Sequence, residues 1–197
     1  MLNNFRDSLK PHLEKLGQGF ASTGLSPNVW TSVALVFAFA SATVYGLGIE
    51  FALIIGGILL LISGFFDIVD GQVARVSQKT STKGAFLDSV SDKIAEVAIF
   101  FGILIGGYAE PYLVFLAITL SLLVSYTRSR GESLGVKLLG VGIGERAERL
   151  LVIGILGIVG GLVPEIPFME YAVIIVIIIA AITFIQRIIV VAKNLRK

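Results

Sequence analysis

The chain has 197 residues, of which 55% are hydrophobic and only 15% charged, and it contains no cysteine. Soluble domains usually carry about a quarter charged residues, so this balance excludes an ordinary soluble domain and a disordered chain alike. The lack of cysteine excludes disulfides and cysteine-ligated metal or redox centres. A mean hydropathy of +0.90 instead indicates an integral membrane protein. The basic balance does not indicate a nucleic-acid partner, because membrane topology accounts for the positions of the basic residues.

The N-terminal residues predict an amphipathic helix that lies on the membrane surface. Apolar side chains recur there at helical spacing, with charged residues largely between them: Phe5, Leu9, Leu13, Leu16 and Phe20. We expect residues 1–22 to form this juxtamembrane helix and residues 23–197 to form the membrane-embedded catalytic domain.

Six apolar stretches follow, each about long enough to cross a bilayer as a helix. They cover residues 28–48, 51–75, 85–107, 110–130, 145–163 and 168–191. None shows the alternation of a membrane β-barrel, so the predicted fold is an all-α membrane protein with six transmembrane helices. The pairs Gly102/Gly106 and Gly157/Gly161 have the spacing of close helix contacts, which we expect within one chain.

The charges predict the orientation of these spans. The first, third and fifth connections hold only acidic residues, namely Glu50, Glu110, Glu165 and Glu170. All 16 basic residues belong to the N-terminal segment, the second and fourth connections with their adjoining helix ends, or the C-terminal end. By the positive-inside rule, both termini are expected in the cytoplasm, in a multi-pass protein of the cell membrane.

Four aspartates lie where two of these spans meet the cytoplasmic side. Asp67 and Asp70 end one apolar stretch, and Asp88 and Asp92 begin the next. The i,i+3 and i,i+4 spacings place each pair on one helix face, and the short connection makes the two helices neighbours. Four converging carboxylates repel one another unless a cation neutralises them. Oxygen ligands select Mg²⁺, Mn²⁺ or Ca²⁺ over zinc or copper, and Mg²⁺ usually completes its shell with substrate phosphates.

Small residues interleave with these aspartates and leave room for a ligand. Gly71 and Ala74 follow Asp67 on its own face, and Gly84 precedes Asp88 by one turn. Arg75 could bind a phosphate oxygen through two nitrogens. The alternative is that the aspartates only cap helix ends and pair with nearby basic residues, but two in-phase pairs with small residues between them disfavour it.

The pattern Asp67-x2-Asp70-Gly71-x2-Ala74-Arg75-x8-Gly84-x3-Asp88-x3-Asp92 resembles the signature of the CDP-alcohol phosphotransferase family, with every defining position filled. The resemblance implies a six-helix enzyme, usually a homodimer, that transfers a phosphoryl-linked lipid from a CDP-lipid to an alcohol and releases CMP. It also implies a pair of metal ions on Asp67, Asp70 and Asp88 with help from Asp92, and Asp92 as general base. By the same resemblance, the CDP-lipid site comprises Asn28, Thr31, Asp67, Gly71, Ala74, Arg75 and Gly84.

Two further segments and the last helix resemble those of phosphatidylinositol-phosphate and archaetidylinositol-phosphate synthases. The segments are 125–130 and 145–150, with Ile185-Gln186-Arg187 near the C-terminus. The resemblance implies that Arg128, Arg149 and Arg187 bind the phosphate of inositol 1-phosphate. The first is lysine in bacterial relatives, and the two side chains are not interchangeable in geometry. For Arg130 and Arg146 the sequence leaves two roles equally open: binding within the site, or ordinary contact with lipid headgroups. Glu96 is expected to pair with Lys93 or an arginine, and Glu132, Glu145 and Glu148 with nearby arginines.

Two other functions remain alternatives. A glycerol-3-phosphate phosphatidyltransferase, which makes phosphatidylglycerol phosphate, shares the donor and an anionic acceptor. A divalent-cation transporter could use the aspartates as an ion site, but it needs polar residues through the whole membrane. Here they gather on one side, so the enzyme is favoured.

Overall fold

The computed structural model describes residues 2–78 and 80–195, and over these ranges it is all-helical, without a strand. The helices are α1 (Leu2–Ala21), α2 (Pro27–Leu47), α3 (Ala52–Val76), α4 (Thr82–Ile105), α5 (Pro111–Ser133), α6 (Arg146–Leu162) and α7 (Phe168–Leu195). Backbone alone is described for residues 2–10. The predicted apolar face at Phe5 and Leu9 therefore lies outside the described side chains.

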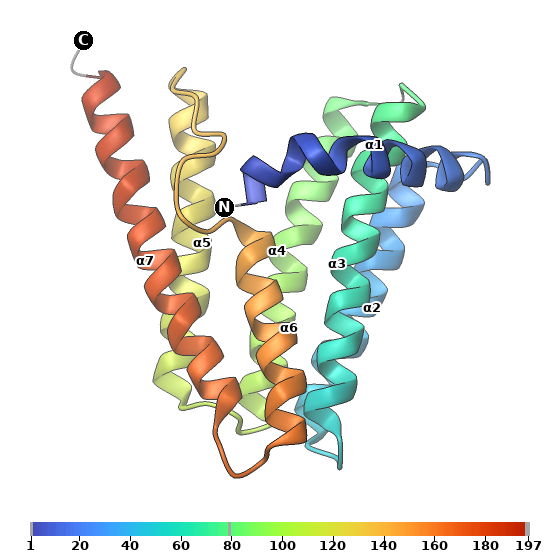
Figure 1. Cartoon of the computed structure of the whole chain (residues 1–197). Coiled ribbons are helices and arrows are strands. Elements are labelled where there is room, and N and C mark those ends of the chain that lie inside the picture. The colour runs from blue at the N-terminus through green and yellow to red at the C-terminus, as the bar shows by residue number, and fades with distance from the viewer. Residues whose placement is uncertain (1, 79, 196–197) are drawn as a thin grey trace.

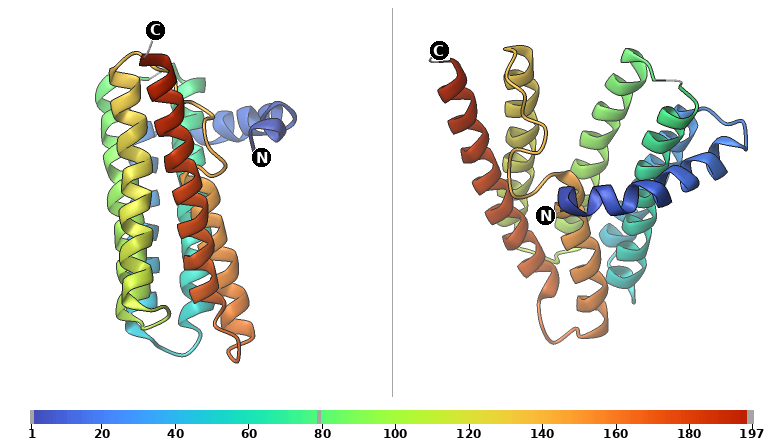
Figure 2. Two further views of the ribbon diagram at one scale, coloured as in Figure 1. Left: turned by 90° about the vertical axis from the view of Figure 1, so that its left-hand side faces the viewer. Right: turned by 45° about the horizontal axis from the view of Figure 1, so that its top comes forward.

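Helices α2 to α7 form an antiparallel bundle, and α1 lies across one end of it (Figure 1). The views in Figure 2 show that α5 and α7 diverge from α3 and α4 toward the end that carries α1. The three connections that contain Glu50, Glu110 and Glu165 lie at the opposite end. The aspartates and most basic residues therefore share the end of the bundle at which the helices spread apart.

Local signals account for the helix boundaries around this end. Ser26, in an extended conformation, precedes Pro27 at the first turn of α2, where proline needs no amide hydrogen. The Ser81 hydroxyl accepts a 3.0 Å hydrogen bond from the Gly84 amide and caps α4. Because α3 continues to Val76 and α4 already begins at Thr82, all four aspartates lie on regular helix.

Glycines set close contacts between the helices. A β-carbon at Gly102 would overlap the Ala42 carbonyl, and one at Gly106 would overlap that of Tyr45, so α4 packs tightly on α2. A β-carbon at Gly161 would likewise overlap the side chain of Ile54 and would hold α6 away from α3. These contacts confirm that the GxxxG spacings serve packing within one chain.

Four of the described helices, α2, α3, α5 and α7, are long and apolar enough to cross a membrane. Their outer faces expose large apolar side chains such as Val36, Phe115 and Ile178, which a water-soluble monomer rarely does. The other two predicted spans, α4 and α6, are not long and apolar enough by the same measure, for physical reasons. Helix α6 has only 17 residues, and the first half of α4 carries Asp88, Asp92 and other charged groups. Charges needed at the site reduce the hydropathy of the helices that carry them.

Candidate active site

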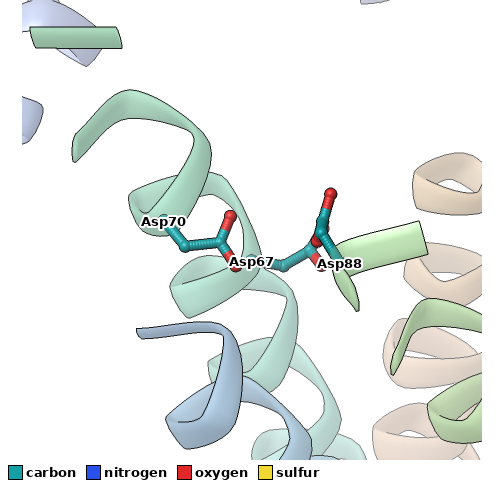
Figure 3. Close-up of side chains that lie close together, drawn as sticks. All are labelled: Asp67, Asp70 and Asp88. Carbon is teal, nitrogen blue, oxygen red and sulfur yellow. The ribbon is translucent and has the colours of Figure 1, made fainter. Parts of the chain in front are cut away.

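Three of the four aspartates form a compact group. Asp67, Asp70 and Asp88 each offer a carboxylate oxygen, and these oxygens all lie within 4.8 Å of one another (Figure 3). Asp70 is only 5% exposed, and its Oδ2 is buried without a hydrogen-bond partner among the described residues. A buried carboxylate oxygen without a partner is costly unless a cation binds it. The all-oxygen donor set and this orphaned atom fit a hard divalent cation.

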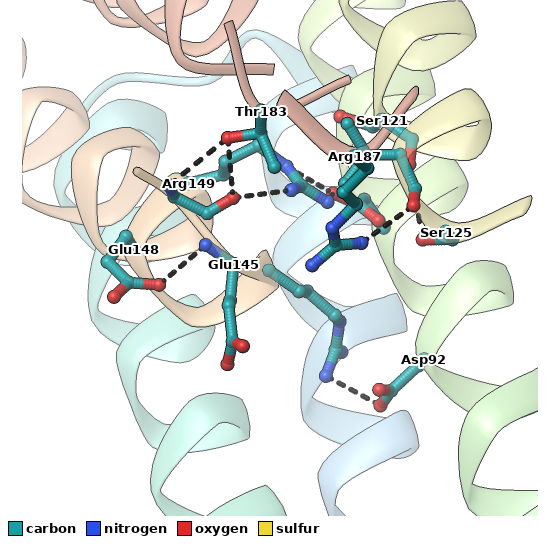
Figure 4. A network of polar contacts seen from close by, with 12 residues as sticks. Asp92, Ser121, Ser125, Glu145, Glu148, Arg149, Thr183 and Arg187 are labelled. Atoms are coloured by element: carbon teal, nitrogen blue, oxygen red, sulfur yellow. Dashed lines mark hydrogen bonds and ion pairs between the residues drawn. The ribbon is translucent and has the colours of Figure 1, made fainter. Parts of the chain in front are cut away.

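Asp92 does not join this group but faces an arginine. Its Oδ1 lies 2.5 Å from Nη1 of Arg146, the ion pair at Asp92 drawn in Figure 4. The same Nη1 lies 3.0 Å from Asp67 Oδ1, so one guanidinium joins α3, α4 and α6. The sequence did not decide whether Arg146 belongs to the site or contacts lipid headgroups, and the structure places it beside the aspartates.

The residues expected to bind the CDP-lipid surround the ends of α2, α3 and α4. Asn28 lies beside Gly84, since a β-carbon on this glycine would meet Asn28 Oδ1 at 3.5 Å. A β-carbon at Gly71 would meet nothing within 4 Å, so the helix surface there is open. The others lie on the same helix ends: Thr31 on α2, Ala74 and the exposed Arg75 on the last turn of α3.

A cavity of about 570 Å³ opens from the aspartates toward α5 and α7. Arg128, Arg149 and Arg187 all line it, together with Asp67, Asp88, Asp92 and Arg146. Its polar wall also includes Lys93, the hydroxyl side chains Ser89, Ser125 and Ser129, and the carboxylates Glu132 and Glu145. Residues from α3, α4, α5, α6 and α7 therefore line one common cavity.

The three arginines are held differently. Arg128 is 37% exposed in its side chain and pairs with Glu132 at 3.1 Å. Arg187 is buried and donates from Nε to the Val141 carbonyl (3.0 Å) and from Nη1 to the Val124 carbonyl (2.7 Å). Neither carbonyl neutralises the charge of Arg187, which leaves this buried cation at the cavity wall suited to an anion.

Arg149 is held by protein groups more completely than the sequence suggested. Its Nε and Nη2 donate to Glu96 Oε1 at 3.1 and 2.8 Å, and its Nη1 donates to the Gly144 carbonyl at 3.4 Å. Figure 4 shows it beside Thr183, which exchanges hydrogen bonds with the Gly144 backbone. The predicted pairing of Glu96 with an arginine is confirmed.

The predictions for the glutamates are only partly right. Glu132 pairs with Arg128 as expected. Glu145 and Glu148 instead form a reciprocal capping box at the start of α6, where each side chain bonds the backbone of the other residue. Helix starts leave backbone amides without partners, and a glutamate three residues into the helix satisfies one.

The sequence did not assign two basic cavity residues to the site, Lys93 and Arg146. Arg146 precedes Arg149 by three positions, so the spacing rule that grouped the aspartates also places these two arginines on one face of α6. That signal could have assigned Arg146 to the site. Lys93 simply follows Asp92, and its direction into the cavity depends on how α4 is rotated in the bundle.

Comparison with known proteins bears on this arrangement. Residues 25–193 match the family model described as CDP-alcohol phosphatidyltransferase. The chain belongs to this family. It is 35% identical to the archaetidylinositol phosphate synthase of Pyrococcus horikoshii over 195 residues, 99% of this chain and 98% of the relative. The resemblance read from the aspartate signature is thereby confirmed, and the protein is a transferase of phospholipid biosynthesis.

Solved structures agree with the fold. The phosphatidylinositol phosphate synthase of Mycobacterium tuberculosis with CDP-DAG bound superimposes with a TM-score of 0.77 at 25% identity. That match covers 91% of this chain and 92% of the other. The same enzyme in complex with manganese and citrate gives a TM-score of 0.78 at 25% identity, over 91% and 88% of the two chains.

Proposed function

We propose that this protein transfers a phosphatidyl or archaetidyl group from a CDP-lipid to the hydroxyl of inositol 1-phosphate and releases CMP. The observation that carries the proposal is that Asp67, Asp88 and Asp92 line the same cavity as Arg128 and Arg187. The aspartates suit a metal-bound diphosphate, and the arginines suit a second, phosphorylated substrate. The names of the synthases to which the chain is similar support the same acceptor.

Asp67, Asp70 and Asp88 would hold the divalent cations, Mg²⁺ or Mn²⁺, as a pair of ions to which Asp92 contributes weakly. The manganese complex of the mycobacterial synthase supports this choice of metal. When bound, the metal neutralises diphosphate charge and stabilises the departing CMP oxygen. Asn28, Thr31, Asp67, Gly71, Ala74, Arg75 and Gly84 would form the CDP-lipid site at the ends of α2, α3 and α4.

The residues on the cavity side perform the acceptor chemistry. Arg128 and Arg187 bind the acceptor phosphate. Arg149, which is paired with Glu96, supports the cavity wall beside them. The carboxylate of Asp92 takes the proton of the acceptor hydroxyl as its oxygen attacks the lipid-bearing phosphorus. The bond from that phosphorus to the CMP oxygen breaks, and CMP leaves with the electron pair.

The membrane arrangement is part of the proposal. Helices α2 to α7 would all span the bilayer, with the short α6 and the charged α4 shielded by their neighbours. The helix within residues 1–22 would lie at the cytoplasmic surface, and residues 23–197 would form the catalytic unit of a homodimer in the cell membrane. The distribution of basic residues supports a cytoplasmic active site.

Acceptor competition tests the function. Purified protein with Mg²⁺ and a radiolabelled CDP-lipid should release CMP with inositol 1-phosphate, and not with unphosphorylated inositol. Glycerol 3-phosphate serves as the competing acceptor in the same mixture. Preferential formation of phosphatidylglycerol phosphate would refute the assignment in favour of the glycerol-3-phosphate transferase.

A further inference from the structure

Arg146 is the one described side chain that forms ion pairs with two of the signature aspartates. Its Nη1 contacts Asp67 at 3.0 Å and Asp92 at 2.5 Å. The side chain is 15% exposed, against 33% for Asp67 and 25% for Asp92. A partly buried charge pair is screened less than a surface pair, so these contacts fix the carboxylates more firmly than surface contacts would.

The backbone of Arg146 is itself fixed. The capping box of Glu145 and Glu148 defines the start of α6, of which Arg146 is the first residue. One turn later, Arg149 is clamped between Glu96 of α4 and the Gly144 carbonyl. Both ends of this first turn are anchored, so the guanidinium of Arg146 approaches the aspartates from a defined direction.

The contacts divide the aspartates into two sets. Asp67, Asp70 and Asp88 converge on a common point, whereas Asp92 lies outside this group and holds Arg146. Asp92 also lines the cavity that contains Arg128 and Arg187. A base that served fully as a metal ligand would lose basicity. The place of Asp92 outside the group of three therefore suits a role as base.

We propose that Arg146 is a positioning residue, which holds the Asp92 carboxylate beside Asp67 at the edge of the metal-binding group and directs it at the acceptor hydroxyl. The inference rests on the proposed function, because it takes Asp92 as the base. Arg146 acts through Asp92 and Asp67. It joins Asp67 on α3, which belongs to the proposed donor site, to Asp92 on α4, the proposed base for the acceptor.

The charge of Arg146 gives this role a signature that a purely structural role lacks. The guanidinium is a cation beside Asp67, one of the three converging carboxylates, so it repels a divalent ion bound there. Replacing it by the neutral, shorter side chain of glutamine should strengthen metal binding while it weakens catalysis. Loss of a structural support would instead disorder the aspartates and weaken both.

The experiment compares Arg146→Gln and Arg146→Lys with the matched control Arg130→Gln. Arg130 is an exposed arginine at the end of α5 that does not line the cavity. Manganese binding is measured by electron paramagnetic resonance on protein in detergent, and kcat and KM by CMP release. A thermal melt checks that each variant is folded.

For Arg146→Gln we expect kcat to fall by about 100-fold, the order of a general-base contribution, with KM for both substrates within about threefold. Its affinity for Mn²⁺ should rise, by up to about tenfold. Arg146→Lys, which keeps the charge but cannot span two carboxylates equally well, should recover part of kcat. Arg130→Gln should match the wild type in every measurement.

Parallel losses of kcat and Mn²⁺ affinity in a folded Arg146→Gln variant would overturn the proposal, as would an unchanged kcat. If Arg146→Gln does not fold, Arg146→Lys decides: wild-type kcat in that variant overturns the proposal, and a reduced kcat with retained Mn²⁺ affinity supports it. The binding measurement needs no acceptor. A wild-type protein that binds Mn²⁺ but releases no CMP with inositol 1-phosphate therefore refutes the proposed function separately.

Discussion

Arg149 and Glu96 form an ion pair in the interior of the bundle, with Nη2 2.8 Å from Oε1 and side chains only 1% and 2% exposed. Such a pair is poor evidence of net stability, because desolvation of both charges offsets their attraction. The pair does fix the relative position of the two side chains, because neither charge can be hydrated by water instead. The pair joins α4 to the start of α6 and thereby supports the cavity wall that Arg128 and Arg187 also line.

Removing one member of this pair should destabilise the protein strongly. Glu96→Ala leaves Arg149 charged and buried without its partner, and we expect a loss of about 3–5 kcal/mol in the free energy of unfolding. The double variant Glu96→Met with Arg149→Met should recover most of this stability, because two apolar side chains fill the space. Thermal melts in detergent measure both effects. Equal stability of Glu96→Ala and the wild type would contradict the buried ion pair.

Asp92→Asn should abolish turnover but leave binding of the CDP-lipid largely intact. The amide keeps the size of the carboxylate and cannot accept the acceptor proton, so kcat should fall by about 10²–10⁴-fold. Equilibrium binding of a labelled CDP-lipid to the purified variant, with Mg²⁺ present, separates the two effects. If donor binding fell as far as kcat, Asp92 would be chiefly a metal or donor ligand.

Asp70→Asn should weaken metal binding. The buried Oδ2 of Asp70 has no described protein partner, so the metal is the partner that this carboxylate requires. Chelation with EDTA should likewise remove the activity of the wild type, and Mg²⁺ or Mn²⁺ should restore it. Titration of Mn²⁺ into the variant checks the first effect. Wild-type Mn²⁺ affinity in Asp70→Asn would argue against a metal at this carboxylate.

Gly71→Ala tests whether a substrate occupies the open surface of α3. A β-carbon there meets no protein atom within 4 Å, so the variant should fold at least as well as the wild type. We expect KM for the CDP-lipid to rise by about tenfold or more, since a methyl group intrudes on a site that only a ligand fills. Gly64→Ala, equally open and two turns earlier on α3, is the control. Identical kinetics for the two variants would place the donor elsewhere.

The sequence was sufficient to predict what depends on neighbouring residues. The spacing of the four aspartates along two adjacent helices predicted that all four converge, because a short connection leaves those helices few ways to pack. Three of them form one group, whereas Asp92 pairs with Arg146. The partners of Arg146 were not predictable in this way. Asp67 lies 79 positions before it, and their contact depends on how α6 packs against α3. Likewise, the amino-acid type of Arg149 suggested a phosphate ligand, but only tertiary packing places Glu96 against it.

The glycines on α3 and α6 have a consequence for the chemistry at the far end of those helices. A β-carbon at Gly57 would overlap the Gly154 carbonyl, and one at Gly161 would overlap Ile54. These contacts therefore set the separation at which the two helices run toward the site. A wider separation of α3 and α6 would place Asp67 farther from Arg146. Because Gly57 and Gly161 carry no side chain, α3 and α6 lie close enough in the apolar part of the bundle for Arg146 to reach Asp67 at the polar end.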